Sequence, residues 1–203
     1  MDYLYAVVLF AISASVTPGP NNIMVMSAGA NFGIRRSLPL LAGICIGFTL
    51  MLLLVGLGFG QLFSLFPGLH LIIKWVGTLY LLYLAWLIAR SADEITGQPA
   101  ARPLGFLKGA LFQWVNAKAW VVATGAIAAF TSVGADFYQQ NLTIALTFFV
   151  VSFPSVGLWL LFGSLLKRWL TSTLARRRFN HAMAALLALS VAPVMYELLS
   201  PPG

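Results

Sequence analysis

The chain has 203 residues, of which 60% are hydrophobic and only 8% are charged, whereas soluble domains carry roughly 25% charged residues. Five acidic and twelve basic residues cannot cover the surface of a soluble protein of this length, so the composition excludes that class and indicates a membrane protein. The net charge of +7 does not indicate nucleic-acid binding, because the basic residues fall in short gaps between long apolar runs.

Six apolar stretches are long enough to cross the hydrocarbon core of a bilayer, which takes about 20 helical residues. The sequence therefore predicts an all-α membrane protein with six transmembrane helices in a single transmembrane domain, 1–203. No basic residue precedes the first stretch, so we expect it to remain in the mature protein. The stretches lie at about 4–30, 38–63, 71–89, 106–130, 142–166 and 182–199.

The first stretch contains two prolines, a glycine and two asparagines within six residues near its middle. Proline lacks a backbone donor and clashes with the preceding turn, so we expect two half-helices rather than one. Backbone groups freed in hydrocarbon are tolerated only where protein or a water-filled cavity surrounds them, which predicts a polar site in mid-membrane. A static kink closed by neighbouring helices is the alternative. The residues are Thr17, Pro18, Gly19, Pro20, Asn21 and Asn22.

The two asparagines of this run are candidates to cap the second half-helix. The first amides of that helix carry partial positive charge and suit an anion such as a substrate carboxylate. On the second stretch, Gly43 and Gly47 form a small-xxx-small pair, which favours close helix packing.

The third stretch is strongly aromatic, and Tyr80 and Tyr83 share one helix face. Core packing is the favoured interpretation, and lining of a transport pathway by Tyr80 is the alternative. The polar gap 91–103 that follows predicts a cytoplasmic linker between two halves, about 1–90 and 104–203. Three spans in each half place the halves in opposite orientations, which is the arrangement of 3+3 inverted-repeat transporters.

The fourth stretch carries Gln113, Asn116 and Lys118 at a depth similar to the first interruption. A lysine there costs about 2.5 to 3.5 kcal/mol on insertion scales, so we expect it to face a cavity or a partner. Either an anionic group of the substrate or carbonyls freed by an interrupted helix could be that partner. The alternative is that Lys118 extends to the cytoplasmic surface from a shorter helix.

The acidic residues all fall in loops or near membrane surfaces, and they are Asp2, Asp93, Glu94, Asp136 and Glu197. A metal-ion exporter needs acidic or histidine ligands within the spans, and an intramembrane enzyme needs a base beside a nucleophile. We therefore favour a neutral zwitterion as the substrate and expect no metal and no cofactor. Metal export, an intramembrane enzyme and a non-transporting structural subunit remain as alternatives.

Basic residues concentrate in the odd-numbered gaps between stretches and at their edges, whereas only Lys74 lies at the edge of an even gap. By the positive-inside rule the odd gaps are cytoplasmic and both termini lie outside. The ten residues are Arg35, Arg36, Arg90, Arg102, Lys108, Lys167, Arg168, Arg176, Arg177 and Arg178.

Three motifs resemble the LysE/RhtB family of bacterial amino-acid exporters over nearly the whole chain. They are the run 17–22 with Gly33, Arg35 and Arg36 after it, the glycine-and-tyrosine segment 75–86, and the segment 112–118. The form Phe-Gln-x-x-Asn-x-Lys of the last motif is closest to the cysteine/O-acetylserine exporter subgroup. Many members carry proline where this chain has Ala117, so the resemblance leaves open whether the fourth helix is broken.

The resemblance implies secondary export of neutral or basic amino acids from the bacterial inner (cytoplasmic) membrane, commonly driven by protons and often by a homodimer. The lack of an embedded acid argues against the basic-substrate branch and leaves the proton carrier unidentified. We expect a multi-pass exporter in contact with membrane lipid, working by alternating access. Its substrate, a small neutral amino acid or amino-acid derivative, binds between the first and fourth spans.

Overall fold

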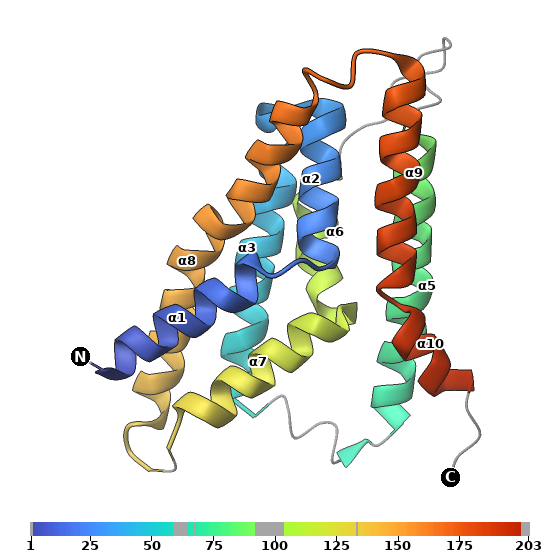
Figure 1. Cartoon of the computed structure of the whole chain (residues 1–203). Coiled ribbons are helices and arrows are strands. Elements are labelled where there is room, and N and C mark those ends of the chain that lie inside the picture. Colours follow the sequence, from blue (N-terminus) through green and yellow to red (C-terminus); the bar gives the residue numbers. More distant parts are fainter. Residues whose placement is uncertain (1, 59–64, 67, 92–103, 133, 200–203) are drawn as a thin grey trace.

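The computed structural model describes residues 2–58, 65–66, 68–91, 104–132 and 134–199, and its regular secondary structure is entirely helical. Two groups of helices stand side by side (Figure 1): α5 packs against α9, and the remaining long helices form the larger group. The helices are α1 (Asp2–Val16), α2 (Pro20–Phe32), α3 (Ile34–Gly56), α5 (Gly68–Arg90), α6 (Phe106–Phe112), the short 3-10 helix η3 (Gln113–Val115), α7 (Ala117–Phe130), α8 (Phe137–Leu166), α9 (Thr173–Leu189) and α10 (Ala192–Leu199).

Three of the described helices are long and apolar enough to cross a membrane, or four spans if the bent pair α1 and α2 is counted as one. The three are α3, α8 and the 71–90 part of α5. α7 is apolar but shorter. The structure thus confirms an all-α protein with membrane-compatible helices, while the number of spans stays a prediction.

The predicted interruption of the first stretch is present. α1 ends at Val16, α2 begins at Pro20, and the two helices are bent by 57°. Gly19 is fully extended, with φ −177° and ψ −179°, and Pro20 occupies the first turn of α2, where a missing amide leaves no hydrogen bond unmade.

The fourth stretch is also broken, which answers the question that Ala117 left open. α6 passes into η3, Asn116 is extended with φ −86° and ψ 106°, and α7 starts at Ala117. The Asn116 side chain accepts a hydrogen bond from the Lys118 amide at 3.1 Å. An asparagine cap therefore starts the second half-helix without a proline.

The last predicted stretch differs from the structure in two ways. α9 already begins at Thr173, where the hydroxyl of Ser172 caps the amide of Ala175 at 3.1 Å. The three arginines expected in a gap therefore lie on a helix, because arginine is a good helix former whatever its hydropathy. The helix then ends at Leu189 before α10 begins. The predicted linker beyond Ser91, with Asp93 and Glu94, and the end of the second stretch, 59–63, lie outside the described residues.

Glycines allow the closest helix contacts. A β-carbon at Gly163 of α8 would collide with the carbonyl of Met26 on α2, and one at Gly43 of α3 with the carbonyl of Phe106 on α6. At Gly47, the β-carbon would collide with the backbone of Ala110. The packing role predicted for Gly43 and Gly47 is therefore confirmed.

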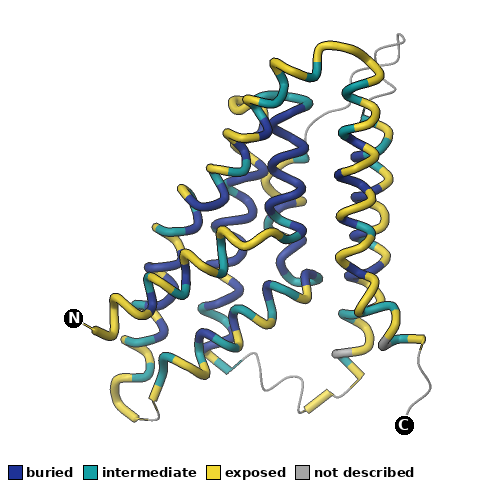
Figure 2. Tube along the Cα trace, viewed as in Figure 1, coloured by how far each residue is buried: buried dark blue, intermediate teal, exposed yellow. Residues whose placement is uncertain are grey.

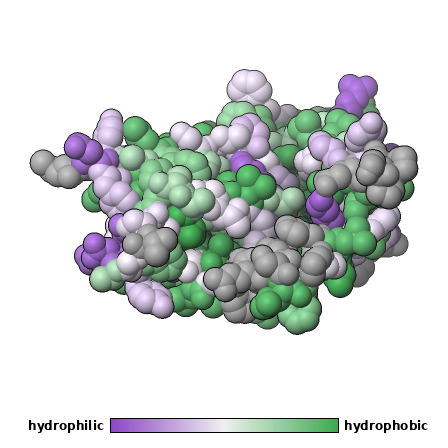
Figure 3. Space-filling view, turned by 90° about the horizontal axis from the view of Figure 1, so that it is seen from below, coloured by the Kyte–Doolittle hydropathy of each residue, from purple (hydrophilic) through white to green (hydrophobic). Residues whose placement is uncertain are grey.

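The buried and exposed residues sort by position in the bundle (Figure 2). α2 and the inward side of α3 are buried, whereas α1, α5, α7, α8 and α9 expose one side, much of it large apolar residues. Such an exposed apolar surface suits contact with lipid. Figure 3 views the end where α1 begins and shows scattered strongly hydrophilic side chains among apolar ones.

Candidate functional site

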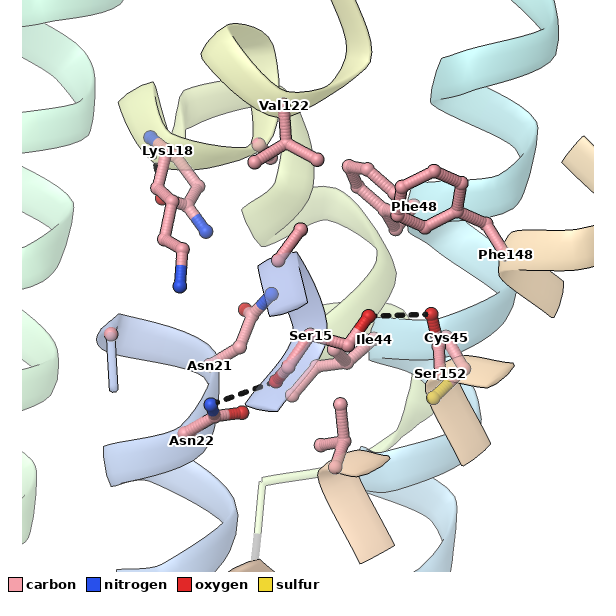
Figure 4. A pocket seen from close by; sticks show the side chains of 15 residues that line it. Ser15, Asn21, Asn22, Ile44, Cys45, Phe48, Lys118, Val122, Phe148 and Ser152 are labelled. Atoms are coloured by element: carbon pink, nitrogen blue, oxygen red, sulfur yellow. Dashed lines mark hydrogen bonds between the residues drawn. The ribbon is translucent and has the colours of Figure 1, made fainter. Parts of the chain in front are cut away.

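A cavity of about 50 Å³ lies at the two helix breaks (Figure 4). This is several times the space that one water molecule needs. The cavity lies where the two buried apolar clusters of the protein meet, since its walls come from both. Its lining residues are Ala14, Ser15, Gly19, Asn21, Asn22, Ile44, Cys45, Phe48, Asn116, Lys118, Ala119, Val122, Phe148, Ser152 and Val156.

Asn22 closes the end of α1. Its Nδ2 donates to the carbonyls of Ser15 at 3.0 Å and Thr17 at 2.9 Å, with a longer contact of 3.4 Å to Val16. The indole of Trp159 donates to the Val16 carbonyl at 3.1 Å. These bonds satisfy carbonyls that the break removes from the helix ladder.

The capping role predicted for the two asparagines is therefore wrong. α2 has Gly19 as its N-cap residue, without a side-chain cap. Asn21 and Asn22 lie one and two residues inside the first turn, where their side chains reach other elements instead of the α2 amides. Asn22 serves the carboxyl end of α1 rather than the amino end of α2.

Asn21 and Gln113 join the two broken spans by a reciprocal pair of amide hydrogen bonds, at 2.9 and 3.0 Å. Gln113 is fully buried, and its Nε2 also donates to the carbonyl of Gly109 at 2.9 Å. These hydrogen bonds connect the two helix breaks to each other. Polar groups buried in the membrane interior need such partners.

Lys118 is half-buried and reaches across to the first break. Its Nζ donates to the carbonyl of Thr17 at 2.7 Å. This is one of the two partners that the sequence predicted, a carbonyl released by an interrupted helix. The same side chain lines the cavity, close to Gly19, where a β-carbon would lie 3.0 Å from Lys118 Cδ.

The amino ends of α2 and α7 both border the cavity, because Gly19, Asn21, Asn116 and Lys118 contribute to its wall. The first amides of a helix carry partial positive charge, and Lys118 adds a full charge to it. The described lining contains no acidic residue. The electrostatics of the cavity therefore favour an anionic group.

The cavity gathers half of the ten predicted site residues. Thr17 takes part through its carbonyl, and Gln113 through its amide pair, while Pro18 and Pro20 shape the break without lining the cavity. The five that line it are Gly19, Asn21, Asn22, Asn116 and Lys118.

Tyr80 is the predicted residue that does not join the site. Its ring packs 5.8 Å from Phe112 and 6.2 Å from Tyr83, between ring centroids. It does not line the cavity, so the packing interpretation fits the structure better.

Sequence reasoning missed the opposite wall, which includes Ser15, Cys45, Phe48, Phe148 and Ser152. Small hydroxyls within helices often bond their own backbone, so a serine in an apolar run gives little signal. On the predicted side of the cavity, the Oδ1 atom of Asn22 is buried with no hydrogen-bond partner.

The family model described as LysE type translocator matches residues 12–200. The chain belongs to this family. Three relatives from Klebsiella pneumoniae subsp. pneumoniae, Salmonella typhimurium and Escherichia coli (strain K12) are named cysteine/O-acetylserine efflux proteins. They are 32%, 34% and 30% identical, and the matches cover 95%, 89% and 92% of this chain and 96%, 89% and 94% of the relatives. No solved structure matches the chain.

Membership of the family confirms the resemblance seen in the three motifs. It identifies this LysE-family protein as a transporter and not an enzyme. The intramembrane-enzyme alternative is thereby removed.

Proposed function

We propose that this LysE-family transporter exports a small neutral amino acid or amino-acid derivative across the bacterial cytoplasmic membrane. The observation that carries the proposal is the meeting of two helix amino ends and the Lys118 ammonium at one cavity. A substrate carboxylate is the anion that these groups suit. The names of the three relatives support a small polar amino acid as the solute.

Lys118 can exchange its partner without leaving a buried group unsatisfied. The Thr17 carbonyl accepts from Lys118 Nζ at 2.7 Å and from Asn22 Nδ2 at 2.9 Å. If Lys118 turns to a substrate carboxylate, Thr17 keeps its bond to Asn22. The carbonyl therefore stays hydrogen-bonded, and Lys118 exchanges a bond to a neutral oxygen for a stronger bond to a charged oxygen.

The absence of an acidic residue from the described lining argues for a substrate without net positive charge. A cationic side chain or a divalent metal ion would enter the cavity against Lys118 and without a counter-charge. The described residues also contain no group of three or more His, Cys, Asp or Glu that could hold a metal ion. We therefore propose a zwitterion and not a metal ion.

The packing pattern supports an inverted repeat of the halves 1–90 and 104–203. The broken span α1 and α2 packs on α8, and the broken span α6 and α7 packs on α3. α3 in turn packs on α8, and α5 on α9. If the first, second and third spans of one half correspond to those of the other, the contact of α1 and α2 with α8 is equivalent to that of α6 and α7 with α3. The contacts of α3 with α8 and of α5 with α9 each join two equivalent spans. On this basis we propose six spans and alternating access about the cavity.

The ends of α2, α5 and α8 and the start of α9 lie together at the upper end of Figure 1. Arg90, Lys167 and Arg176 are at these ends. The positive-inside rule supports placing this end in the cytoplasm and both termini outside. We propose proton coupling and a homodimer from the family resemblance alone, and we assign no proton carrier.

Export from loaded proteoliposomes tests the function. Vesicles with purified protein and labelled serine, cysteine or O-acetylserine should release label at a rate set by the protein. Replacing Lys118 by alanine or glutamine should lower the rate at limiting substrate at least about tenfold, because a charge-assisted bond is lost. Lys108→Ala is the matched control, since Lys108 is exposed on α6 and away from the cavity.

Elution as a single species in detergent would show that the variants are folded. Wild-type vesicles that release none of the three amino acids faster than empty vesicles would contradict the proposed function. Folded Lys118 variants that match the Lys108 control would contradict the site.

A further inference from the structure

Ser15 of α1 and Ser152 of α8 meet at the wall of the cavity, with their Oγ atoms 3.4 Å apart. Figure 4 shows this hydroxyl pair and Lys118 on different sides of the cavity. Ser152 is only 4% exposed. The two spans that the pair connects belong to different halves of the chain.

This pair has unused hydrogen-bonding capacity. Elsewhere in the described bundle, Ser37, Thr49 and Thr147 each donate to the carbonyl four residues before, at 2.8 to 2.9 Å. The Ser15 and Ser152 hydroxyls instead contact each other, and one such bond uses only one of their two hydrogens. The second hydrogen and the remaining lone pairs are available to a polar atom in the cavity.

Apolar groups surround the hydroxyl pair. The rings of Phe48 and Phe148 lie 5.3 Å apart between centroids, and both side chains are buried. Cys45 and Val156 complete this part of the lining. A side chain that enters here therefore meets a short apolar space with one polar feature.

The remaining groups of the cavity account for the backbone of an amino acid. The carboxylate suits Lys118 and the two helix amino ends, as argued above. The ammonium group needs an acceptor; Asn22 lines the cavity, and its Oδ1 is buried and has no hydrogen-bond partner. Asn22 Nδ2 donates to the Ser15 carbonyl at 3.0 Å, so the ammonium acceptor lies beside the hydroxyl pair.

We propose that Ser15 and Ser152 form the side-chain subsite of this transporter and select amino acids with a short side chain that carries a polar atom. Phe48 and Phe148 set the length that is accepted. This inference rests on the proposed function, because it assumes that an amino acid occupies the cavity.

Selectivity measured in proteoliposomes tests the subsite. Alanine and serine differ by one hydroxyl, so comparing how strongly each competes with labelled serine measures whether the site recognises that hydroxyl. Ser152→Ala and Ser15→Ala should each lower the preference for serine over alanine about tenfold, because a site built to bond a hydroxyl rejects the analogue that lacks it. Ser155→Ala is the matched control, because Ser155 is buried on the same helix but does not line the cavity.

A second variant tests the length limit independently. Phe148→Ala should allow valine and leucine to compete, while the preference for serine over alanine stays near the wild-type value.

Ser152→Cys keeps a weak donor and should restore part of the preference that Ser152→Ala loses.

The outcomes separate the two proposals. Wild-type protein that transports no amino acid contradicts the proposed function. Wild-type transport with the same serine-to-alanine ratio in Ser15→Ala and Ser152→Ala overturns the subsite and leaves the function standing.

Discussion

The carbonyl of Thr17 receives two hydrogen bonds, one from Asn22 and one from Lys118. Of these two bonds, the one from Lys118 could be predicted from the sequence and the one from Asn22 could not. The prolines indicated that backbone carbonyls would be freed, and the depth of Lys118 indicated that it needed a partner. The partner of Asn22 could not be predicted, because its contact depends on the angle between α1 and α2.

Gly19 provides a test at the same scale. A β-carbon there would lie 3.0 Å from Lys118 Cδ and 3.2 Å from Nζ, so Gly19→Val should push the lysine away from the cavity. We expect a roughly tenfold higher KM for export. Gly125→Val is the control, because a β-carbon at Gly125 meets nothing within 4 Å. Equal KM values for the two variants would show that Lys118 needs no space at Gly19.

At the scale of elements, the two breaks arise from different chemistry. The first break could be predicted from the sequence because of Pro18 and Pro20. The second has no proline after Asn116, and its break depends on a cap bond from Lys118 N to Asn116 Oδ1. Hydropathy also failed at α9, because it measures preference for lipid and not for a helix. The predicted start at 182 therefore lies later in the chain than Thr173, where α9 begins.

Proline substitution can test the second break. Ala117 is exposed and is the first residue of α7, a position where proline is well tolerated. Ala117→Pro should therefore keep the unfolding free energy or raise it by about 0.4 to 1 kcal/mol. Ala123→Pro, inside α7, should lower it by about 3 kcal/mol or more. Unfolding in detergent measures both, and a strong loss in Ala117→Pro would show that α7 continues through this point.

At the scale of the whole molecule, the family and the helical class followed from composition and motifs, whereas the orientation in the membrane follows only from charge. Basic residues lie near the ends of several helices at one end of the bundle, and the positive-inside rule predicts that this end is cytoplasmic. The contacts between helices of the two halves could not be predicted from the sequence, because glycine contacts such as Gly163 with Met26 join distant segments.

Labelling with a membrane-impermeant maleimide tests the orientation. The only cysteine, Cys45, is buried and can be replaced by alanine to give a background without thiols. In intact cells, cysteine introduced at Tyr5 should be labelled, and cysteine at Arg36 should be labelled only after the membrane is opened. Both positions are exposed on the protein. The reverse pattern would place the termini inside.

The proposed export requires that Lys118 bind the carboxylate of an amino acid at the two helix breaks. The most direct measurement compares serine with serine amide, which lacks the carboxylate, as competitors of labelled serine. Wild-type protein should favour the acid by at least about tenfold, as expected for a charge-assisted bond, and Lys118→Gln should lose most of that preference. A Lys118→Gln protein that transports serine and still favours the acid as strongly as wild type would show that Lys118 does not bind the carboxylate.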